Sequence, residues 1–173
     1  MTLKSASSVY KAALKELDTP TDISNDGVTK IVKAINGLVA DAFTLYVKTK
    51  NFHWHMSGRH FRDYHLLLDE QADQIFASID PLAERVRKLG GITIRSIAEI
   101  GKLASIKEDN AEFVDPDDML RELMEDNKRV IANMRKAHKV CDGNDDVATA
   151  SLLEVYIDES ERRAWFLFET IRK

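Results

Sequence analysis

The residue types best suited to chemistry in this chain form two pairs of potential metal ligands. His65 and Asp69 are four residues apart, and Asp80 and Glu84 have the same spacing. Residues at positions i and i+4 lie on one face of a helix, so each pair presents two ligands to one metal ion. The spacing therefore predicts metal binding by a helical segment.

A single chain cannot bring both pairs to one metal ion. Asp69 and Asp80 are eleven positions apart, which is roughly 16 Å of helix at about 1.5 Å per residue. Metal–ligand bonds are only about 2 Å long. An antiparallel copy of the same helix in a second subunit would place the first pair of one chain opposite the second pair of the other. A two-fold axis would then create two identical sites, so the spacing predicts a metal site at a dimer interface.

Length and composition predict one globular domain. The 173 residues are 44% hydrophobic and 31% charged, which is ordinary for a soluble protein that can bury a core. No stretch approaches the roughly 18 apolar residues that span a bilayer, so no membrane partner is expected. The formal net charge of −4 suits the attraction of cations. It disfavours nucleic-acid binding over the whole surface, which requires clustered Lys and Arg.

The cysteine content and the first residues predict a cytoplasmic protein. Cys141 has no second cysteine with which to form an internal disulfide, as is typical of a reducing compartment. No His or basic cluster lies near it in the sequence, so we expect a buried or incidental thiol. The N-terminal stretch carries charges every few positions and lacks the apolar core of a signal peptide.

Two regions are expected along the chain. Residues 1–27 are predicted to form an N-terminal tail, with a short amphipathic segment followed by a polar linker, and residues 28–173 a helical domain. The first long helix should start near Val28, because apolar residues then recur at helical spacing. It should end between His55 and Gly58, where a Ser-Gly pair gives a stop signal.

The second long helix is expected from about His60 to Leu89, closed by a double glycine. Pro81 lies inside this range and removes one backbone donor. The apolar pattern nevertheless continues beyond it. We therefore expect one kinked but continuous helix.

A long connection precedes the last two helices. It contains a short helix predicted at Ser96–Ala104. Asp115 followed by Pro116 is a strong start signal for the third long helix, which should run to about Val140. The fourth is expected over Asp146–Ile171. Four long helices with a crossover of about 25 residues between the second and third predict an all-α, ferritin-like four-helix bundle.

The usual metal site inside such bundles is missing from the sequence. Di-iron bundles commonly use a Glu-x-x-His motif on paired helices, and no Glu is followed by His three residues later. The last two long helices contain only His138. The ligand candidates therefore lie on the first two long helices.

The sequence around these candidates resembles the signature of the Dps family, the mini-ferritins also called DNA-binding proteins from starved cells. The resemblance covers Val28 to Ile171 and is carried by His53, Trp54, Met56, Gly58, Phe61, His65, Asp69, Asp80 and Glu84, followed by the double glycine. It implies a stress-response protein that assembles as a hollow shell of twelve subunits. It further implies that the protein oxidises Fe(II), preferably with hydrogen peroxide, and stores the ferric mineral inside.

The resemblance also implies how the ligands are divided between subunits. His53, His65 and Asp69 come from one subunit, and Asp80 and Glu84 come from its two-fold mate, with two irons expected at each such site. Imidazole suits Fe(II) and carboxylate suits Fe(III). Zinc or manganese remain alternative occupants, because ligand type alone does not identify the metal.

Several neighbouring residues have secondary roles or none. Trp54 follows a ligand directly and is a candidate electron donor when only one iron is bound. Lys50 lies one helical turn before the same ligand and is a candidate for tuning a proton or a ligand. His55 and His60 flank the turn, and Asp73 lies one turn after a ligand. None of these three is expected to bind metal.

Four acidic residues gather around the turn between the third and fourth long helices: Asp142, Asp145, Asp146 and Glu154. Around a three-fold axis they would form an acidic pore that concentrates Fe(II). The alternative is that they stabilise a helix N-terminus through its dipole.

DNA binding is the alternative function. The usual agent in the family is a flexible basic tail. Here Lys4, Lys11 and Lys15 are nearly balanced by Glu16 and Asp18. Twelve weak tails could still act together through avidity. The sequence favours a ferroxidase and iron store over a protein that chiefly compacts DNA.

Overall fold

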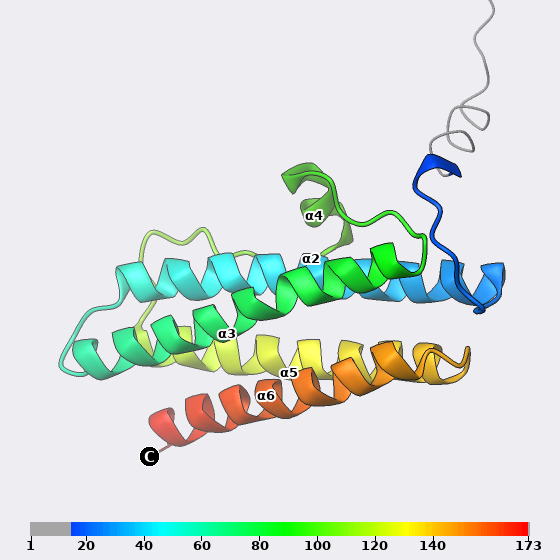
Figure 1. Ribbon diagram of the computed structural model, residues 1–173. Helices are drawn as coiled ribbons and strands as arrows, with labels where there is room; N and C mark the ends of the chain where they lie inside the picture. The colour runs from blue at the N-terminus through cyan, green and yellow to red at the C-terminus, as the bar shows by residue number, and fades with distance from the viewer. Residues whose placement is uncertain (1–14, 173) are drawn as a thin grey trace, which may run out of the picture.

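The computed structural model describes residues 15–172, and this part of the chain is folded entirely into helices and connecting loops. Four long helices lie side by side, and a short fifth helix lies outside them against α2 (Figure 1). The helices are α2 (Asn25–His55), α3 (Phe61–Lys88), α4 (Ile97–Leu103), α5 (Pro116–Asp142) and α6 (Val147–Ile171). This arrangement confirms the predicted ferritin-like bundle with a short helix in its crossover.

The bundle consists of two helical hairpins joined by the crossover. α2 packs on α3, α5 packs on α6, and α2 also contacts α5. Each helix buries one apolar stripe, as expected for amphipathic helices. Fully buried members of this core include Ile31, Ile35, Leu45, Phe52, Leu68, Leu82, Leu120, Leu123, Leu153 and Leu167.

α2 begins three residues before the predicted start at Val28. The Ser24 hydroxyl accepts a hydrogen bond from the Gly27 amide and caps the helix. Asn25 and Gly27 were interpreted as linker because both residue types are common in turns. The helix therefore begins inside the predicted tail, and the boundary between tail and domain at residue 27 stays a prediction.

α3 is one helix with Pro81 inside it, as predicted. The crossover leaves its C-terminus through Gly90, which has a φ of +78°, and Gly91. A Cβ atom at Gly91 would lie 2.3 Å from a methyl carbon of Val32. This close approach explains the second glycine, because any side chain there would separate the crossover from α2.

A buried carboxylate of α2 accepts several hydrogen bonds from the crossover. Asp41 accepts hydrogen bonds from the amides of Ser105 and Ile106, at 2.5 and 3.2 Å, and from the Ser105 hydroxyl and the Asn133 amide, at 2.9 and 3.0 Å. These bonds place α4 over α2. The short helix was predicted at Ser96–Ala104, and these two residues are its caps.

The structure bears on three further predictions: the N-terminal amphipathic segment, the state of Cys141 and the lack of a membrane-spanning helix. The proposed amphipathic segment falls almost entirely on residues 1–14, outside the described residues. Thr19 donates to the Arg87 carbonyl and Arg87 donates to the Leu17 carbonyl, so the end of this region contacts α3. Cys141 is fully buried, as expected, and burial raises the pKa of its thiol to about 12. Among the described helices, none is long and apolar enough to cross a membrane.

Candidate metal centre

His53 and His65 face each other across the α2–α3 hairpin. His53 lies in the last turn of α2 and His65 in the second turn of α3. The short turn between these helices brings the two rings into a stack, with centroids 3.7 Å apart and planes at 20°. The Phe61 ring also stacks with the His65 ring, with centroids 5.0 Å apart. The packing thus fixes both imidazoles before any metal binds.

The hydrogen bonds of these rings leave one nitrogen of each available. His53 Nδ1 lies 2.8 Å from the His65 carbonyl oxygen, and His65 Nδ1 lies 2.9 Å from the His53 carbonyl oxygen. A carbonyl oxygen only accepts, so each Nδ1 must carry the proton and donate. Each Nε2 then has a free lone pair. Histidines that bind metal commonly donate their other ring N–H to a backbone carbonyl in this way. The sequence alone did not predict these two hydrogen bonds.

Asp69 lies beside this pair but is already bonded to a lysine. Its Oδ1 is 3.7 Å from His53 Nε2 and 2.5 Å from Lys50 Nζ. The hydrogen bond from Lys50 holds the pKa of the Asp69 carboxyl below its usual value, and the same bond raises the pKa of the Lys50 ammonium. The Asp69 side chain remains 44% exposed, so the ion pair is open to displacement from solvent.

Asp80 and Glu84 lie farther along α3, away from the histidines. Both are exposed, and Glu84 pairs with Lys88 at 3.1 Å. Within residues 15–172, no three side chains of His, Cys, Asp or Glu converge closely enough to hold a metal ion. The chain therefore brings His53, His65 and Asp69 into one neighbourhood and leaves Asp80 and Glu84 apart from it.

An exposed aromatic residue separates the two groups. At 100° per residue, His65, Asp69, Phe76 and Asp80 fall within about 60° of one another around the α3 axis. Phe76 is 55% exposed, and its ring packs against Tyr46 of α2 at 5.0 Å. An apolar centre with polar residues on both sides matches the core-and-rim arrangement of a protein–protein interface. Tyr46 belongs to the apolar pattern expected for the first long helix. Phe76 was not singled out from the sequence, although helical spacing places it on this stripe.

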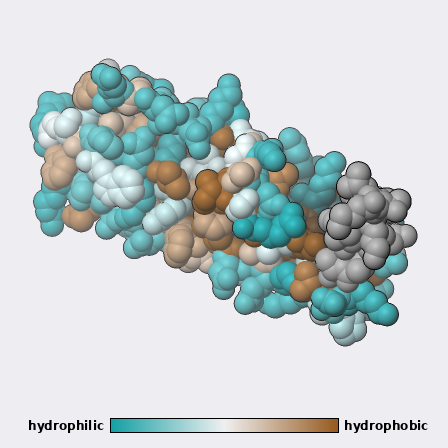
Figure 2. All heavy atoms as spheres, turned by 90° about the horizontal axis from the view of Figure 1, so that it is seen from above, coloured by the Kyte–Doolittle hydropathy of each residue, from teal (hydrophilic) through white to brown (hydrophobic). Residues whose placement is uncertain are grey.

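Trp54 points away from the bundle rather than into its core. It is 64% exposed and lines an apolar groove of about 480 Å³ with Val47 of α2 and Ile97 of α4. Figure 2 shows apolar side chains gathered near the middle of the face that carries α4. Trp54 is therefore one residue from the candidate ligand His53 and also accessible to a neighbouring molecule.

The four acidic residues near the α5–α6 turn are not equivalent. Asp146 is 3% exposed, caps α6 through the Thr149 amide and pairs with Arg85 at 2.8 Å. Asp142 and Asp145 are exposed. Glu154 lies 3.1 Å from His138 and is also exposed. Three of the four carboxylates are therefore open to solvent, and Asp146 is held by the fold.

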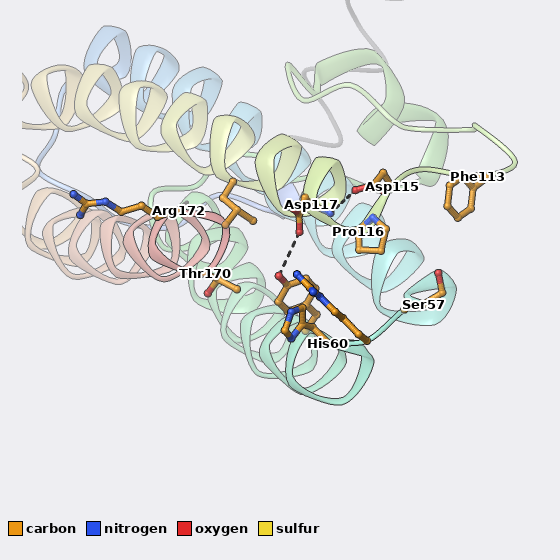
Figure 3. A pocket seen from close by; sticks show the side chains of 12 residues that line it. Ser57, His60, Phe113, Asp115, Pro116, Asp117, Thr170 and Arg172 are labelled. Atoms are coloured by element: carbon orange, nitrogen blue, oxygen red, sulfur yellow. Dashed lines mark hydrogen bonds between the residues drawn. The ribbon is translucent and has the colours of Figure 1, made fainter.

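Two hollows of residues 15–172 that are larger than the Trp54 groove lie away from the candidate ligands. One of about 570 Å³ lies at the end of the bundle, where Tyr64 donates to Asp117 at 3.3 Å and His60 and Arg172 also line the wall (Figure 3). None of the five candidate ligands lines it. The candidate centre is thus an open surface and not a closed pocket of one chain.

The amino-acid sequence is similar to one family model and to several known proteins. The sequence matches the model of the ferritin-like domain over residues 32–173. An uncharacterized low temperature-induced protein of Nostoc sp. is 35% identical over 85% of this chain and 81% of its own length. A DNA protection during starvation protein of Brevibacillus brevis is 34% identical over 77% of this chain and 89% of its own length.

Solved structures agree with these relatives. DpsC from Streptomyces coelicolor superposes with a TM-score of 0.87 and 26% identity, covering 90% of this chain and 91% of its own. The Dps protein of Vibrio cholerae, described as a member of a broad superfamily of ferritin-like diiron-carboxylate proteins, gives a TM-score of 0.82 with 25% identity, covering 87% of this chain and 94% of its own.

Proposed function

Because the chain belongs to the Dps family of ferritin-like proteins, we propose that it oxidises Fe(II) at sites shared by two subunits and stores the ferric product. The observation that carries this proposal is the division of the ligands. Two histidines with free Nε2 atoms lie beside Asp69, while Asp80 and Glu84 lie beyond Phe76 on the same exposed stripe.

A second copy of the chain supplies the missing half. If two α3 helices pack antiparallel about their exposed aromatic residue, the histidine end of each helix meets the Asp80 and Glu84 end of the other. Phe76 and Tyr46 then lie near the two-fold axis and are covered by the same residues of the mate. Each interface gains two complete sites, and each site has nitrogen and oxygen ligands that accept both Fe(II) and Fe(III).

Hydrogen peroxide is the proposed oxidant. Two Fe(II) ions at one site each give one electron, the O–O bond breaks, and two protons complete two molecules of water. Because the electrons leave as a pair, no hydroxyl radical is released. Zinc and manganese fit the same ligands and would compete with iron without performing this reaction.

Lys50 and Trp54 are proposed to assist this chemistry. Iron must displace the Lys50 ammonium from Asp69 Oδ1, so Lys50 keeps the carboxylate ionised and ordered until iron arrives. Trp54 is proposed to give one electron when a site holds a single iron. Replacing Trp54 by Phe should then raise the radical yield during peroxide turnover, measured by spin trapping, and an unchanged yield would refute the electron-donor role.

The family resemblance further suggests a shell of twelve subunits with an iron route through it. Asp142, Asp145 and Glu154 are exposed near the α5–α6 turn and suit an acidic pore around a three-fold axis. Asp146 belongs to the same cluster, but its carboxylate is bonded to Arg85 and α6. Analytical ultracentrifugation would test the assembly directly.

One experiment tests the proposed site. Fe(II) is added anaerobically with peroxide to the wild type and to the His65→Ala, Asp69→Ala double variant, and oxidation is followed spectrophotometrically. The double variant should lose most of the activity. His55→Ala is a matched control, because His55 is exposed and bonds only to the Asn51 carbonyl of its own helix. Equal rates in the wild type and the double variant would refute the site.

DNA protection is the second candidate, favoured by the name of the Brevibacillus brevis relative. Lys4, Lys11 and Lys15 near the N-terminus are the proposed contacts, multiplied by the number of subunits. A gel shift at low and moderate salt distinguishes the candidates. Absence of a shift at both salt concentrations would leave iron oxidation as the only proposed function.

A further inference from the structure

Another pair of carboxylates with i, i+4 spacing lies on the side of α5 that faces α2. Glu122 and Asp126 both bond to Lys48 of α2, at Nζ···O distances of 3.0 and 2.8 Å. The Lys48 side chain is only 6% exposed, and that of Asp126 is 12% exposed. The pair has the same spacing as His65 and Asp69, but its oxygens converge on an ammonium group.

We propose that Lys48 is a tethered cation that fills a carboxylate site between α2 and α5 and excludes divalent metal ions from it. Binding of iron would thereby be confined to the outer face of α2 and α3. The proposal concerns residues outside the candidate centre and does not depend on its activity.

The geometry around Lys48 is that of a cation site with a protein cation in it. Two oxygens from one helix face lie at hydrogen-bond distance from Nζ. A divalent ion at the same point needs oxygens at about 2.1 Å, which requires each carboxylate to move inward by less than about 1 Å. Side chains on one face of a helix make such a shift through their χ angles. The oxygens are thus placed for a metal once the ammonium is gone.

The same carboxylates are accessible to ions from solution. Glu122 and Asp126 line a groove of about 750 Å³ between α5 and the crossover segment, and Lys48 also lines it. The Glu122 side chain is 41% exposed. An ion therefore has a route to the pair, and the tethered ammonium rather than a steric barrier keeps it out.

Lys48 is also held in its charged form. Burial lowers the pKa of Lys48, but the hydrogen bonds from Lys48 to Asp126 and Glu122 outweigh burial, and the pKa lies above its ordinary value. The Phe52 ring lies 5.8 Å from Nζ and adds a cation–π contact. These contacts therefore hold Lys48 as an ammonium between the two helices.

Binding of Co(II) to the full-length protein tests the proposal. Co(II) is redox-stable without peroxide, and equilibrium dialysis counts the ions bound per chain. Lys48→Ala should bind one more Co(II) per chain than the wild type, and the added Asp126→Asn substitution should abolish the gain. Lys48→Arg keeps a cation and should show no gain. Lys33→Ala removes an exposed lysine from the same helix and is the matched control.

Two outcomes would overturn the proposal. One is equal Co(II) binding by the folded wild type and by Lys48→Ala. The second outcome concerns a Lys48→Ala variant that does not fold without metal. The proposal then predicts that Co(II) restores its helical circular dichroism, and no recovery would contradict the proposal. Because the readout is the difference between variants, it is independent of how many ions the outer site binds or whether that site oxidises iron.

Discussion

Lys48 and Lys50 are two residues apart on α2, and each bonds to a carboxylate of another helix, yet the two ion pairs lie in opposite environments. Lys48 points toward α5, where its side chain and that of Asp126 are 6% and 12% exposed. Lys50 points toward α3, where its side chain and that of Asp69 are 16% and 44% exposed. About 200° of helical rotation separates the two lysines.

This difference in exposure indicates which carboxylates are open to a metal ion. A buried ion pair is hard to break, because removing either partner leaves an uncompensated charge away from water. An exposed pair is worth little and exchanges readily with solvent ions. The inner carboxylates therefore act as structure, whereas Asp69 is held ready for exchange. His53 and His65 beside Asp69 are candidate nitrogen ligands, and the inner pair has no such neighbours among the described residues.

The largest expected effect comes from breaking the inner pair. Asp126→Ala leaves a buried ammonium with one carboxylate partner and should lower the free energy of unfolding by about 3 kcal/mol, roughly 150-fold in the folding equilibrium. Urea denaturation measures this change. Asp118→Ala removes an exposed acid that pairs only with Arg121 on the same helix and should have little effect. Similar urea midpoints for Asp126→Ala and Asp118→Ala would show that burial of the carboxylate does not decide how much its ion pair stabilises the protein.

At the Lys50–Asp69 pair we expect a smaller effect, and we expect it on metal affinity and not on stability. Lys50→Met keeps an apolar stem but removes the ammonium that competes for Asp69, so the affinity for Co(II) should rise by about two- to fivefold, with little change in stability. Isothermal titration calorimetry measures the affinity. Weaker binding in Lys50→Met would mean that Lys50 positions the ligand and does not compete with the metal.

Much of this contrast could not be predicted from the sequence. Helical spacing pointed to both candidate ligand pairs on α3, whose metal binding stays a prediction, and the start signal at Asp115 and Pro116 placed the α5 terminus correctly. The Lys48–Asp126 pair joins residues 78 positions apart. It depends on which faces of α2 and α5 pack together, and no local pattern encodes that. The Ser24 cap was overlooked because the residues after it also favour turns.

The smallest effect concerns the titration of Asp69. Lys50 lowers the pKa of Asp69 in the folded protein. The contribution of this ion pair to the free energy of unfolding is therefore fully present above the ordinary carboxyl pKa of about 4, and it is lost as the pH falls through the lowered value. In Lys50→Met the pKa should return toward the ordinary value. Carboxyl carbon NMR of Asp69 follows the titration, and the same pKa in both proteins would remove Lys50 as the cause.

Complementation between two inactive variants tests the central claim, that each site is built from two chains. One variant carries His65→Ala with Asp69→Ala, and the other carries Asp80→Ala with Glu84→Ala. In a mixed dimer, one of the two sites receives all its ligands intact. Each variant alone should be inactive, and co-assembly in equal amounts should restore roughly one quarter of the wild-type ferroxidase rate per chain. No recovery in mixed assemblies of native size would contradict a shared site.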